Sequence, residues 1–240
     1  MEWKVERVIS CPSTMDLAKL KAKAGAPEGT AIVAEQMTSG RGTHGRTWHA
    51  PKGGLYMSFV LRDLQDPHLL TLALGNAVAE VLEVAGTDPK LKWVNDVWVG
   101  GKKIAGILVE GEATGKHIDF LVAGVGINVN GHAREFPKGL RDIPTTLEDE
   151  LQCDSCIPDL EAVLLASLAS WVDKVRQGRN QEVVTAFRQR DALLGRKVRV
   201  EEAGPAPAEG TADGIDDQGH FRLKANGKVQ TFATGSIRLA

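Results

Sequence analysis

The sequence is poor in cysteine and has neither a long apolar run nor an excess of basic residues. Three cysteines, Cys11, Cys153 and Cys156, cannot make a disulfide framework. Cys153 and Cys156 have C-x-x-C spacing, but no second pair or suitably spaced histidine follows, so we expect two reduced thiols beside a helix start. No segment approaches about 18 consecutive apolar residues, and no signal-peptide pattern opens the chain. These absences predict a cytoplasmic protein that does not contact a membrane.

The charge balance argues against nucleic acid as the general partner. The chain has 29 basic and 31 acidic residues, a net charge of -2, whereas a nucleic-acid binder usually carries a basic excess. The 240 residues are 42% hydrophobic and 25% charged. That composition is typical of a globular protein with a real core, organised as one large domain or one medium and one small domain.

The first 190 residues mix helical and strand patterns joined by short turns. Ser13 and Asp16 have capping-box-like spacing, Asp66-Pro67 precedes a long amphipathic helix that Gly86 closes, and Gly100-Gly101 predicts a tight hairpin. Neighbouring strands with short connections favour an α+β domain with a mixed, mostly antiparallel sheet and flanking helices, over residues 1–190. The expected helices are 14–24, 67–86, 160–176 and 180–194, and the expected strands are 30–36, 55–61, 91–94, 96–99, 103–110 and 120–129.

The pattern changes after Gly195, where no helical periodicity remains. Turn signals at residues 217–219 and 226–227 separate short strand candidates, and the low-complexity segment 204–210 reads as a loop. Five short strands in about 45 residues predict a small β-barrel as a second domain, residues 191–240. The candidates are 197–200, 210–215, 220–224, 229–232 and 237–239.

The stretch GRGTHGRTWHAPKGG, residues 40–54, combines flexibility with cationic groups. Its glycines let backbone N–H groups approach an anion, and Arg41 and Arg46 add forked donors suited to carboxylate or phosphate. Trp48 could cover a flat ring. A mobile flap over an anionic small molecule and a solvated surface loop both remain open. The G-x-G-x-x-G spacing within it is followed by Pro51 and a strand rather than a helix, which rejects a dinucleotide fingerprint, and no Walker A motif occurs.

Two further stretches place polar groups in apolar, strand-forming sequence. In KWVNDVWVGGKKIAGILVE, Lys92 and Lys103 flank Asn95 and Asp96, and buried polar groups of this kind need partners. Gly106 leaves room for a close approach. The segment GVGINVN, residues 124–130, places Asn128 at a strand end. A hairpin with a solvated lysine, local turn hydrogen bonds and an ordinary strand exit are the alternatives.

The ordered combination GRGTHGRTW, KWVND, KKIAGIL and GVGINVN resembles the biotin protein ligases over about residues 10–130. LGRKVRV and GSIRL near the end resemble the family's SH3-like C-terminal domain. The resemblance implies a class II synthetase-like catalytic domain, and with no helix-turn-helix before Met1 it suggests the catalytic-only type without a DNA-binding module. Such enzymes use ATP and Mg²⁺ to convert biotin to biotinoyl-5'-AMP and transfer it to a lysine of a biotin carboxyl carrier domain.

The resemblance also implies roles for individual residues. Lys103 corresponds to the family's catalytic lysine, acting as an electrostatic clamp on the biotin carboxylate and α-phosphate, and Arg41 is the second catalytic candidate. Ser13 and Thr14 correspond to residues that bind the ureido ring. The expected biotin-binding set is Ser13, Thr14, Met15, Met37, Gly40, Arg41, Gly42, Thr43, Lys103 and Gly106. The expected ATP-binding set is Arg41, Arg46, Trp48, Asn95, Asp96, Lys103 and Asn128, with Asn95 and Asp96 also near the metal, whose ligands are not assigned.

Three departures from the family pattern bear on binding. Thr43 stands where a basic residue is usual, so retention of the intermediate could be weaker. Met37 stands where glutamine is usual, with Gln36 one place earlier and on the other face of a strand. Val94 replaces a common proline. A lipoate-type ligase and a non-catalytic biotin-binding protein remain as alternatives, and a homodimer formed through strands such as residues 103–110 is a possibility.

Overall fold

A seven-stranded mixed sheet forms the centre of the larger part of the protein, and a five-stranded antiparallel sheet follows it. The computed structural model describes residues 1–64, 67–115, 117–201 and 206–240. The first sheet has the order β1-β2-β3-β7-β6-β5-β4, and only the β1–β2 pair is parallel. Its strands are β1 (Lys4–Cys11), β2 (Thr30–Met37), β3 (Leu55–Leu61), β4 (Lys90–Lys92), β5 (Asp96–Val99), β6 (Lys102–Thr114) and β7 (His117–Ile127).

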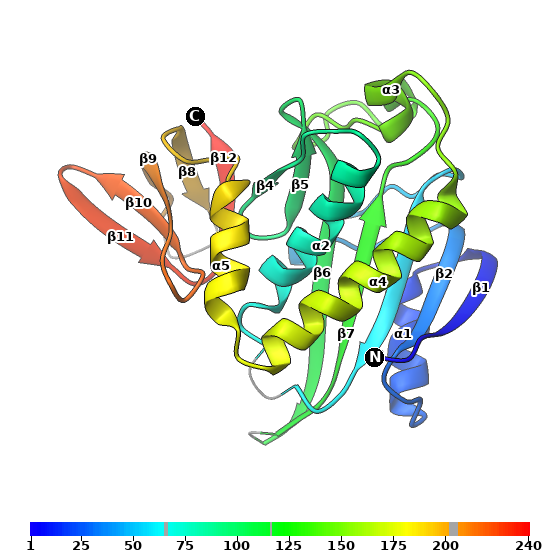
Figure 1. Ribbon diagram of the computed structural model, residues 1–240. Helices are drawn as coiled ribbons and strands as arrows, with labels where there is room; N and C mark the ends of the chain where they lie inside the picture. Colours follow the sequence, from blue (N-terminus) through cyan, green and yellow to red (C-terminus); the bar gives the residue numbers. More distant parts are fainter. Residues whose placement is uncertain (65–66, 116, 202–205) are drawn as a thin grey trace.

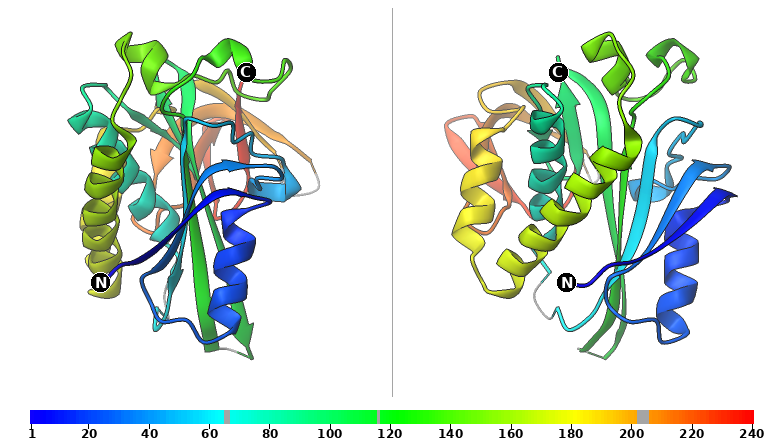
Figure 2. Two further views of the ribbon diagram at one scale, coloured as in Figure 1. Left: turned by 90° about the vertical axis from the view of Figure 1, so that its right-hand side faces the viewer. Right: turned by 45° about the vertical axis from the view of Figure 1, so that its right-hand side comes forward.

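Helices cover the two faces of this sheet unequally (Figures 1 and 2). The helices α2 (Leu70–Val84), α4 (Ile157–Arg176) and α5 (Asn180–Gln189) lie on one face, while α1 (Thr14–Lys23) lies on the other. A short helix, α3 (Leu147–Leu151), follows the loop after β7. α2 is apolar around most of its circumference because it packs against the sheet on one side and against α4 on the other. This arrangement leaves the face that carries α1 open for a site.

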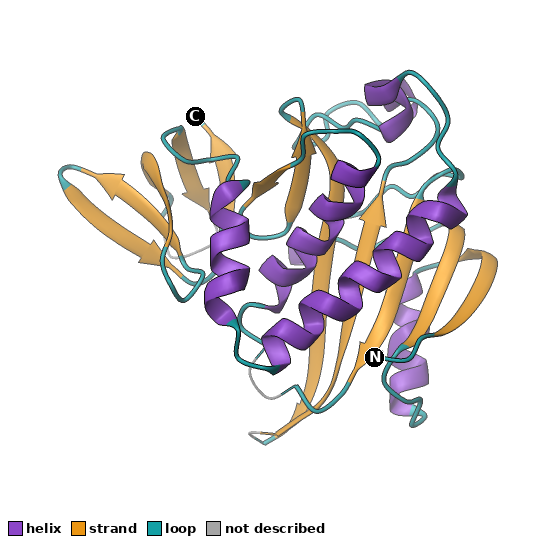
Figure 3. Ribbon diagram, viewed as in Figure 1, coloured by secondary structure: helices purple, strands orange, loops and turns teal. Residues whose placement is uncertain are grey.

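The C-terminal sheet has the order β11-β10-β9-β8-β12, with β11 and β12 at its two edges (Figure 3). It contains β8 (Lys197–Glu201), β9 (Ala208–Ile215), β10 (Phe221–Ala225), β11 (Lys228–Phe232) and β12 (Ser236–Leu239). The buried side chains Val198, Val200, Phe221, Leu223 and Ile237 continue into the same hydrophobic core as the first sheet. Trp93 joins the two parts, since its Nε1–H donates to the carbonyl of Gly219 at 2.9 Å.

The predicted α+β class is confirmed, and several element boundaries need correction. β1 is not predicted by the sequence pattern, because an edge strand with mostly exposed residues has no apolar alternation. α2 begins at Leu70 with Leu69 as its N-cap, and Asp66 lies outside the described residues. Asn180 is the first residue of α5 rather than its cap, and that helix ends at Gln189 instead of reaching residue 194. The Gly100-Gly101 hairpin is present, with φ values of 57° and 77°.

Two further sequence features can be placed. The three cysteines are free, and Cys156 is the N-cap residue of α4, as expected for thiols beside a helix start. Residues 204–205 of the predicted 204–210 loop lie outside the described residues, and β9 already begins at Ala208. Among the residues that the structure describes, no helix is long and apolar enough to cross a membrane.

Candidate active site

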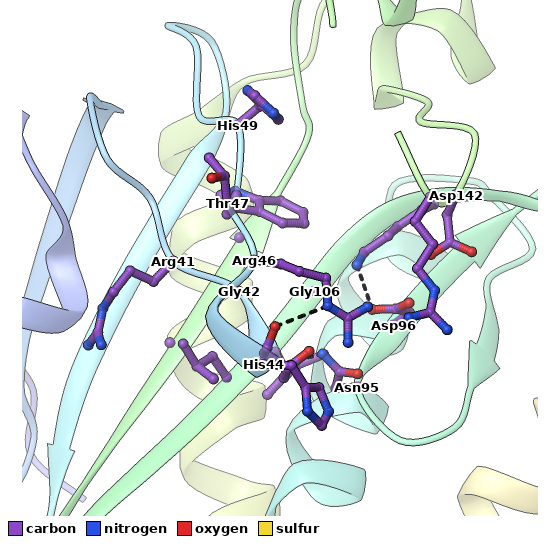
Figure 4. A pocket seen from close by; sticks show the side chains of 18 of the residues that line it. Arg41, Gly42, His44, Arg46, Thr47, His49, Asn95, Asp96, Gly106 and Asp142 are labelled. Carbon is purple, nitrogen blue, oxygen red and sulfur yellow. Dashed lines mark hydrogen bonds and ion pairs between the residues drawn. The ribbon is translucent and has the colours of Figure 1, made fainter. Parts of the chain in front are cut away.

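A cavity of about 380 Å³ opens on the sheet face that carries α1 and gathers most of the predicted site residues (Figure 4). Its volume is within the usual range for a small-molecule site. Gly40 does not line it, but its carbonyl accepts the backbone N–H of Trp48 at 2.8 Å and so shapes the flap. The predicted residues on its wall are Ser13, Thr14, Met15, Met37, Arg41, Gly42, Thr43, Arg46, Trp48, Asn95, Asp96, Lys103, Gly106 and Asn128.

Hydroxyl groups line one end of the cavity, where α1 begins. Ser13 is the N-cap residue of α1, but its side chain makes no capping hydrogen bond, so the predicted capping box is wrong. The Ser13 Oγ is buried and has no hydrogen-bond partner among the described residues. Thr14 Oγ1 lies 2.7 Å from Ser58 Oγ, and both side chains are buried. A buried hydroxyl without a partner is costly, and a polar ligand in the cavity would relieve that cost.

Met37 closes this end of the cavity and partners Thr14. The backbone N–H and the hydroxyl of Thr14 both point to Met37 Sδ, at 3.3 and 3.5 Å. A thioether is a weak acceptor, so these donors are held less firmly than an amide oxygen would hold them. Met37 therefore gives this part of the wall a weakly polar surface.

The flap, residues 40–54, folds back on itself as a short irregular hairpin. The Gly42 N–H donates to the carbonyl of Arg46 at 2.7 Å, and a single 3-10 turn, Thr43–Gly45, closes the hairpin with His44 at a φ of 56°. The Arg41 guanidinium contacts Asp16 Oδ1 at 3.0 Å and Glu110 Oε2 at 2.9 Å. Figure 4 shows Arg41 apart from the side chains grouped around Asp96, so the structure does not bring the two predicted catalytic residues together.

Two glycines on neighbouring strands make the floor of the cavity beneath Trp48. Gly106 in β6 is the register partner of Gly126 in β7. A Cβ on Gly126 would lie 2.8 Å from the Trp48 ring, and one on Gly106 would lie 3.1 Å from it. The ring therefore rests directly on the backbone of both strands, its Nε1 buried without a hydrogen-bond partner among the described residues. Lys103 Nζ lies 5.4 Å from the centre of the Trp48 ring.

The wall of the cavity opposite the hydroxyl groups carries a carboxylate between two ammonium groups. Asp96 Oδ1 lies 2.6 Å from Lys103 Nζ, and Asp96 Oδ2 lies 3.4 Å from Lys92 Nζ. Lys92 Nζ also contacts Asp142 Oδ1 at 2.7 Å. Burial alone would raise the pKa of Asp96, but the charges and hydrogen bonds of Lys103 and Lys92 outweigh it and lower that pKa. Lys103, with 24% of its side chain exposed, is the more accessible of the two cations.

Arginines from separate parts of the chain converge near this wall. Arg46 Nε donates to the Thr43 carbonyl at 3.2 Å, and Arg46 Nη2 donates to Ser236 Oγ in β12 at 3.3 Å. Burial lowers the pKa of Arg141, and the neighbouring charges of Arg46 and Arg238 lower it further. The C-terminal sheet thus borders the cavity directly, through residues 235–237.

The two predicted asparagines are tied to the backbone on either side of Lys103. The Asn95 side chain donates to the Ile107 carbonyl in β6 at 3.0 Å, a bond to the neighbouring strand rather than within a local turn. Asn128 Nδ2 donates to the Thr145 carbonyl at 3.0 Å, while its buried Oδ1 has no partner within the described ranges. The Oδ1 of Asn128 is consequently available to a ligand donor.

The acidic side chain on this wall suits a metal ion that is bound jointly by the protein and by the phosphates of a ligand. Within the described parts of the chain, no group of three or more His, Cys, Asp or Glu side chains is placed to hold a metal ion. Mg²⁺ is commonly bound through one or two carboxylates together with substrate phosphates. Asp96 could supply one such carboxylate, although it is paired with Lys103 and Lys92 in this structure.

Many of the cavity residues were outside the predicted set, among them Ser58, Arg141, Asp142 and Ser236. Ser58 sits in the middle of a uniformly apolar strand, where a lone buried hydroxyl could have been noticed. Arg141, Asp142 and Ser236 come from a loop and a separate sheet, and no local sequence signal links them to the flap. Only the folded chain brings them to the same wall.

Comparisons with known proteins identify the family to which the chain is similar. A model of the biotin/lipoate A/B protein ligase family matches residues 6–128, and a model of the biotin protein ligase C terminal domain matches residues 193–239. The chain is 34% identical to the bifunctional ligase/repressor BirA of Bacillus subtilis, over 95% of the chain and 71% of that protein. It is 31% identical to a biotin–[acetyl-CoA-carboxylase] ligase of Mycobacterium tuberculosis, over 92% and 83% respectively.

Solved structures give the same answer for the fold of both parts. The biotin protein ligase from Aquifex aeolicus in complex with biotin and ATP matches with a TM-score of 0.86 and 28% identity, covering 99% of each chain. The family predicted from the four motifs is thereby confirmed over the lipoate-type and non-catalytic alternatives, and the C-terminal sheet fits the predicted SH3-like fold. The two family models, the relatives and the solved structure together establish that the chain belongs to the biotin protein ligase family.

Proposed function

We propose that this enzyme activates biotin with ATP to biotinoyl-5'-AMP, releasing pyrophosphate, and transfers the biotinoyl group to a lysine of a biotin carboxyl carrier domain, releasing AMP. The observation that carries the proposal is the cavity's division into two chemically different ends. Buried hydroxyls of Ser13, Thr14 and Ser58 stand at one end and suit a ureido ring. Cations stand at the other end and suit a carboxylate and phosphates, with Lys103 Nζ 5.4 Å from the centre of the Trp48 ring and 2.6 Å from Asp96 Oδ1.

The first step must bring two anions together, and the cationic end supplies the means. Lys103 is a protonated donor, so it lowers the repulsion between the biotin carboxylate and the α-phosphate and stabilises the charge that develops at phosphorus. Arg46 approaches from the flap, held by Thr43 and Ser236. Arg41 is paired with Asp16 and Glu110 in this structure, so we propose that it reaches the ligand only after exchanging those partners.

The flap protects the intermediate from water. Biotinoyl-AMP is a mixed anhydride that hydrolyses readily, and a cover that excludes water serves the second step, attack by the acceptor lysine. Gly42 and Thr43 lie at the tip of the flap, and Met15 and Met37 line the hydroxyl end beneath it. Trp48 and Asn128 are proposed for the nucleotide, because they offer a ring and a buried amide oxygen without partner among the described residues.

The remaining features follow from the same reaction. Mg²⁺ would accompany ATP and screen its phosphates, and Asp96 is the proposed carboxylate beside it. We propose a catalytic domain of residues 1–190, an SH3-like domain of residues 191–240, a cytoplasmic location, and no part for DNA or a membrane in the reaction.

A homodimer is also proposed, with part of β6 as the contact. The predicted strand, residues 103–110, is not free along its whole length, because Lys102–Gly106 pairs with β5 on one side. From Leu108 onward, β6 pairs only with β7 among the described residues. This half has an open edge that a second copy could extend.

The proposal is tested by pyrophosphate release with ATP, Mg²⁺ and biotin, followed by labelling of a carrier domain. Lys103→Ala should slow adenylate formation by roughly 10²-fold or more, the order seen when one charge-stabilising donor is removed. Lipoate in place of biotin should give no release above background. Equal rates for wild type and Lys103→Ala would remove the assigned role of Lys103, and no biotin-dependent release by wild type would end the proposed function.

A further inference from the structure

Lys92 is a buried cation that the proposed chemistry leaves without a role. Its side chain is 4% exposed, although it lies on the cavity wall. The ammonium is enclosed by Asp142 at 2.7 Å, Asp96 at 3.4 Å and the Trp98 ring, whose centre is 5.0 Å away. A cation so enclosed is poorly placed to bind a substrate, yet burying it is expensive unless it is needed there.

Asp96, the carboxylate that Lys92 shares with Lys103, shows what the buried charge of Lys92 can do. Asp96 is 11% exposed and gives one oxygen to each lysine. If Lys92 were absent, the whole negative charge of Asp96 would act on Lys103. That charge would weaken the field that Lys103 presents to an anionic ligand. With Lys92 present, two ammonium and two carboxylate groups, including Asp142, balance one another.

The backbone around Lys103 is held by the same segment that holds Lys92. The Lys103 N–H donates to the Ile143 carbonyl at 2.8 Å, and the Thr145 N–H donates to the Lys103 carbonyl at 2.9 Å. Asp142, which pairs with Lys92, directly precedes Ile143. Side-chain and backbone contacts therefore fix residues 142–145 against both lysines at once.

We propose that Lys92 is a positioning residue for adenylation, which holds Asp96 and Asp142 in a charge-balanced pair and so sets the place and effective charge of the Lys103 ammonium. The inference rests on the proposed function, since its readout is the activation of biotin. It assigns Lys92 no contact with substrate. The effect should appear in the rate of the chemical step more than in the affinity for biotin.

The test is a charge-balance cycle built from Lys92→Met, Asp142→Asn and the double variant. Lys92→Met keeps most of the side-chain volume but leaves an extra negative charge beside Lys103. We expect kcat for biotin-dependent pyrophosphate release to fall roughly 10²-fold, with little change in KM for biotin. The double variant removes one charge of each sign and should recover about tenfold or more of that loss, a coupling that only interacting charges produce.

A matched control separates charge from packing. Lys92→Arg retains the cation and should keep kcat within about tenfold of wild type, and thermal unfolding of each variant gives the folded fraction by which rates are divided. If Lys92→Met does not fold, the comparison of Lys92→Arg with the double variant decides. Two results would overturn the proposal. One is a folded double variant whose kcat is still roughly 10²-fold below wild type, as expected for Lys92→Met alone. The other is a Lys92→Met enzyme with the kcat of wild type.

The two proposals fail in different ways in this experiment. If wild type releases pyrophosphate with biotin and Lys103→Ala does not, the proposed function stands whatever the Lys92 variants do. Wild-type rates in Lys92→Met would then refute the positioning role alone. No biotin-dependent release by wild type would refute the function itself.

Discussion

Ser13 has two possible uses for its hydroxyl, and the geometry separates them. At a helix start, a serine side chain normally accepts a backbone N–H of the first turn and contributes about 1 kcal/mol to stability. Here that bond is absent, although the Ser13 backbone has the extended conformation of an N-cap, with φ of -156° and ψ of 131°. Its Oγ is buried at the end of the cavity that suits a ureido ring.

We predict that Ser13→Ala weakens biotin binding without destabilising the fold. Loss of one neutral hydrogen bond should cost about 1 kcal/mol, roughly fivefold in Kd. Because no capping bond is lost, the melting temperature should stay near that of wild type. Titration calorimetry with biotin and thermal unfolding measure the two effects, and a lower melting temperature with unchanged Kd would show that the hydroxyl is structural. Thr146→Ala is a suitable control, since Thr146 does cap a helix, accepting from the Asp149 N–H.

At the scale of elements, the loop between β7 and α4 organises one wall of the site. It places Asp142 on Lys92 and residues 143–145 on the backbone of Lys103. Its first turn is held by α3, where His132 Nδ1 lies 2.9 Å from Asp149 Oδ1 and Glu148 Oε2 accepts the Gly131 N–H at 2.6 Å. The position of this loop therefore depends partly on an ionisable contact.

The histidine contact predicts a pH dependence of known sign. The hydrogen bond with Asp149 raises the pKa of His132, assisted by the charge of Glu148 and opposed by that of Arg134. A raised folded pKa means that the contribution to stability is complete below the unfolded pKa, about 6.5, and is lost as pH rises through the folded value. His132→Gln should therefore be less stable than wild type at pH 5.5 and equally stable at pH 9, in urea unfolding at the two values. A wild-type advantage that grows with pH would contradict the contact.

At the scale of the whole molecule, Glu201 connects the C-terminal sheet to the wall of the site. Its carboxylate lies 3.3 Å from Arg141 in the loop after β7 and 3.0 Å from Arg238 in β12. Arg199 approaches it at 3.6 Å. The charges of Arg46 and Arg238 also act on Arg141 and lower its pKa. Glu201 is therefore the carboxylate that holds several guanidinium groups together between the two sheets.

We predict that Glu201→Gln lowers the free energy of unfolding by about 1–3 kcal/mol, between the values for exposed and buried ion pairs. The loss should be accompanied by a higher KM for ATP, because Arg141 and the flap contact to Ser236 depend on the same junction. Asp217→Asn is the matched control. Its carboxylate is 70% exposed and pairs only with Arg188 among the contacts described, so its effect should stay within about 0.5 kcal/mol. Equal effects of the two substitutions in urea unfolding would refute the role of the junction.

Local chemistry accounts for the parts of the protein that sequence alone predicted. Short apolar runs located β3 and β5, whose residues are almost all buried, and the helical pattern located α1 and α4 to within a few residues, because each helix buries one face. Two glycines with positive φ required the hairpin at Gly100-Gly101. The sequence also indicated the flap, Lys103 and Asp96 as site candidates. The flap combines glycines with cationic side chains, and polar groups in an apolar strand, such as Lys103 and Asp96, need partners.

The sequence by itself indicated the candidate cationic groups for an anion and the candidate hydroxyl groups for a polar ring, since residue type and local pattern suffice for that. Tertiary structure decided the rest. It left the Ser13 hydroxyl without a cap, turned Arg41 towards Asp16 and Glu110, and brought Asp142 and Ser236 to a wall that begins at Asp96. These side-chain arrangements depend on contacts between residues up to about 200 positions apart. No local sequence pattern shows which distant partner a charged side chain will contact.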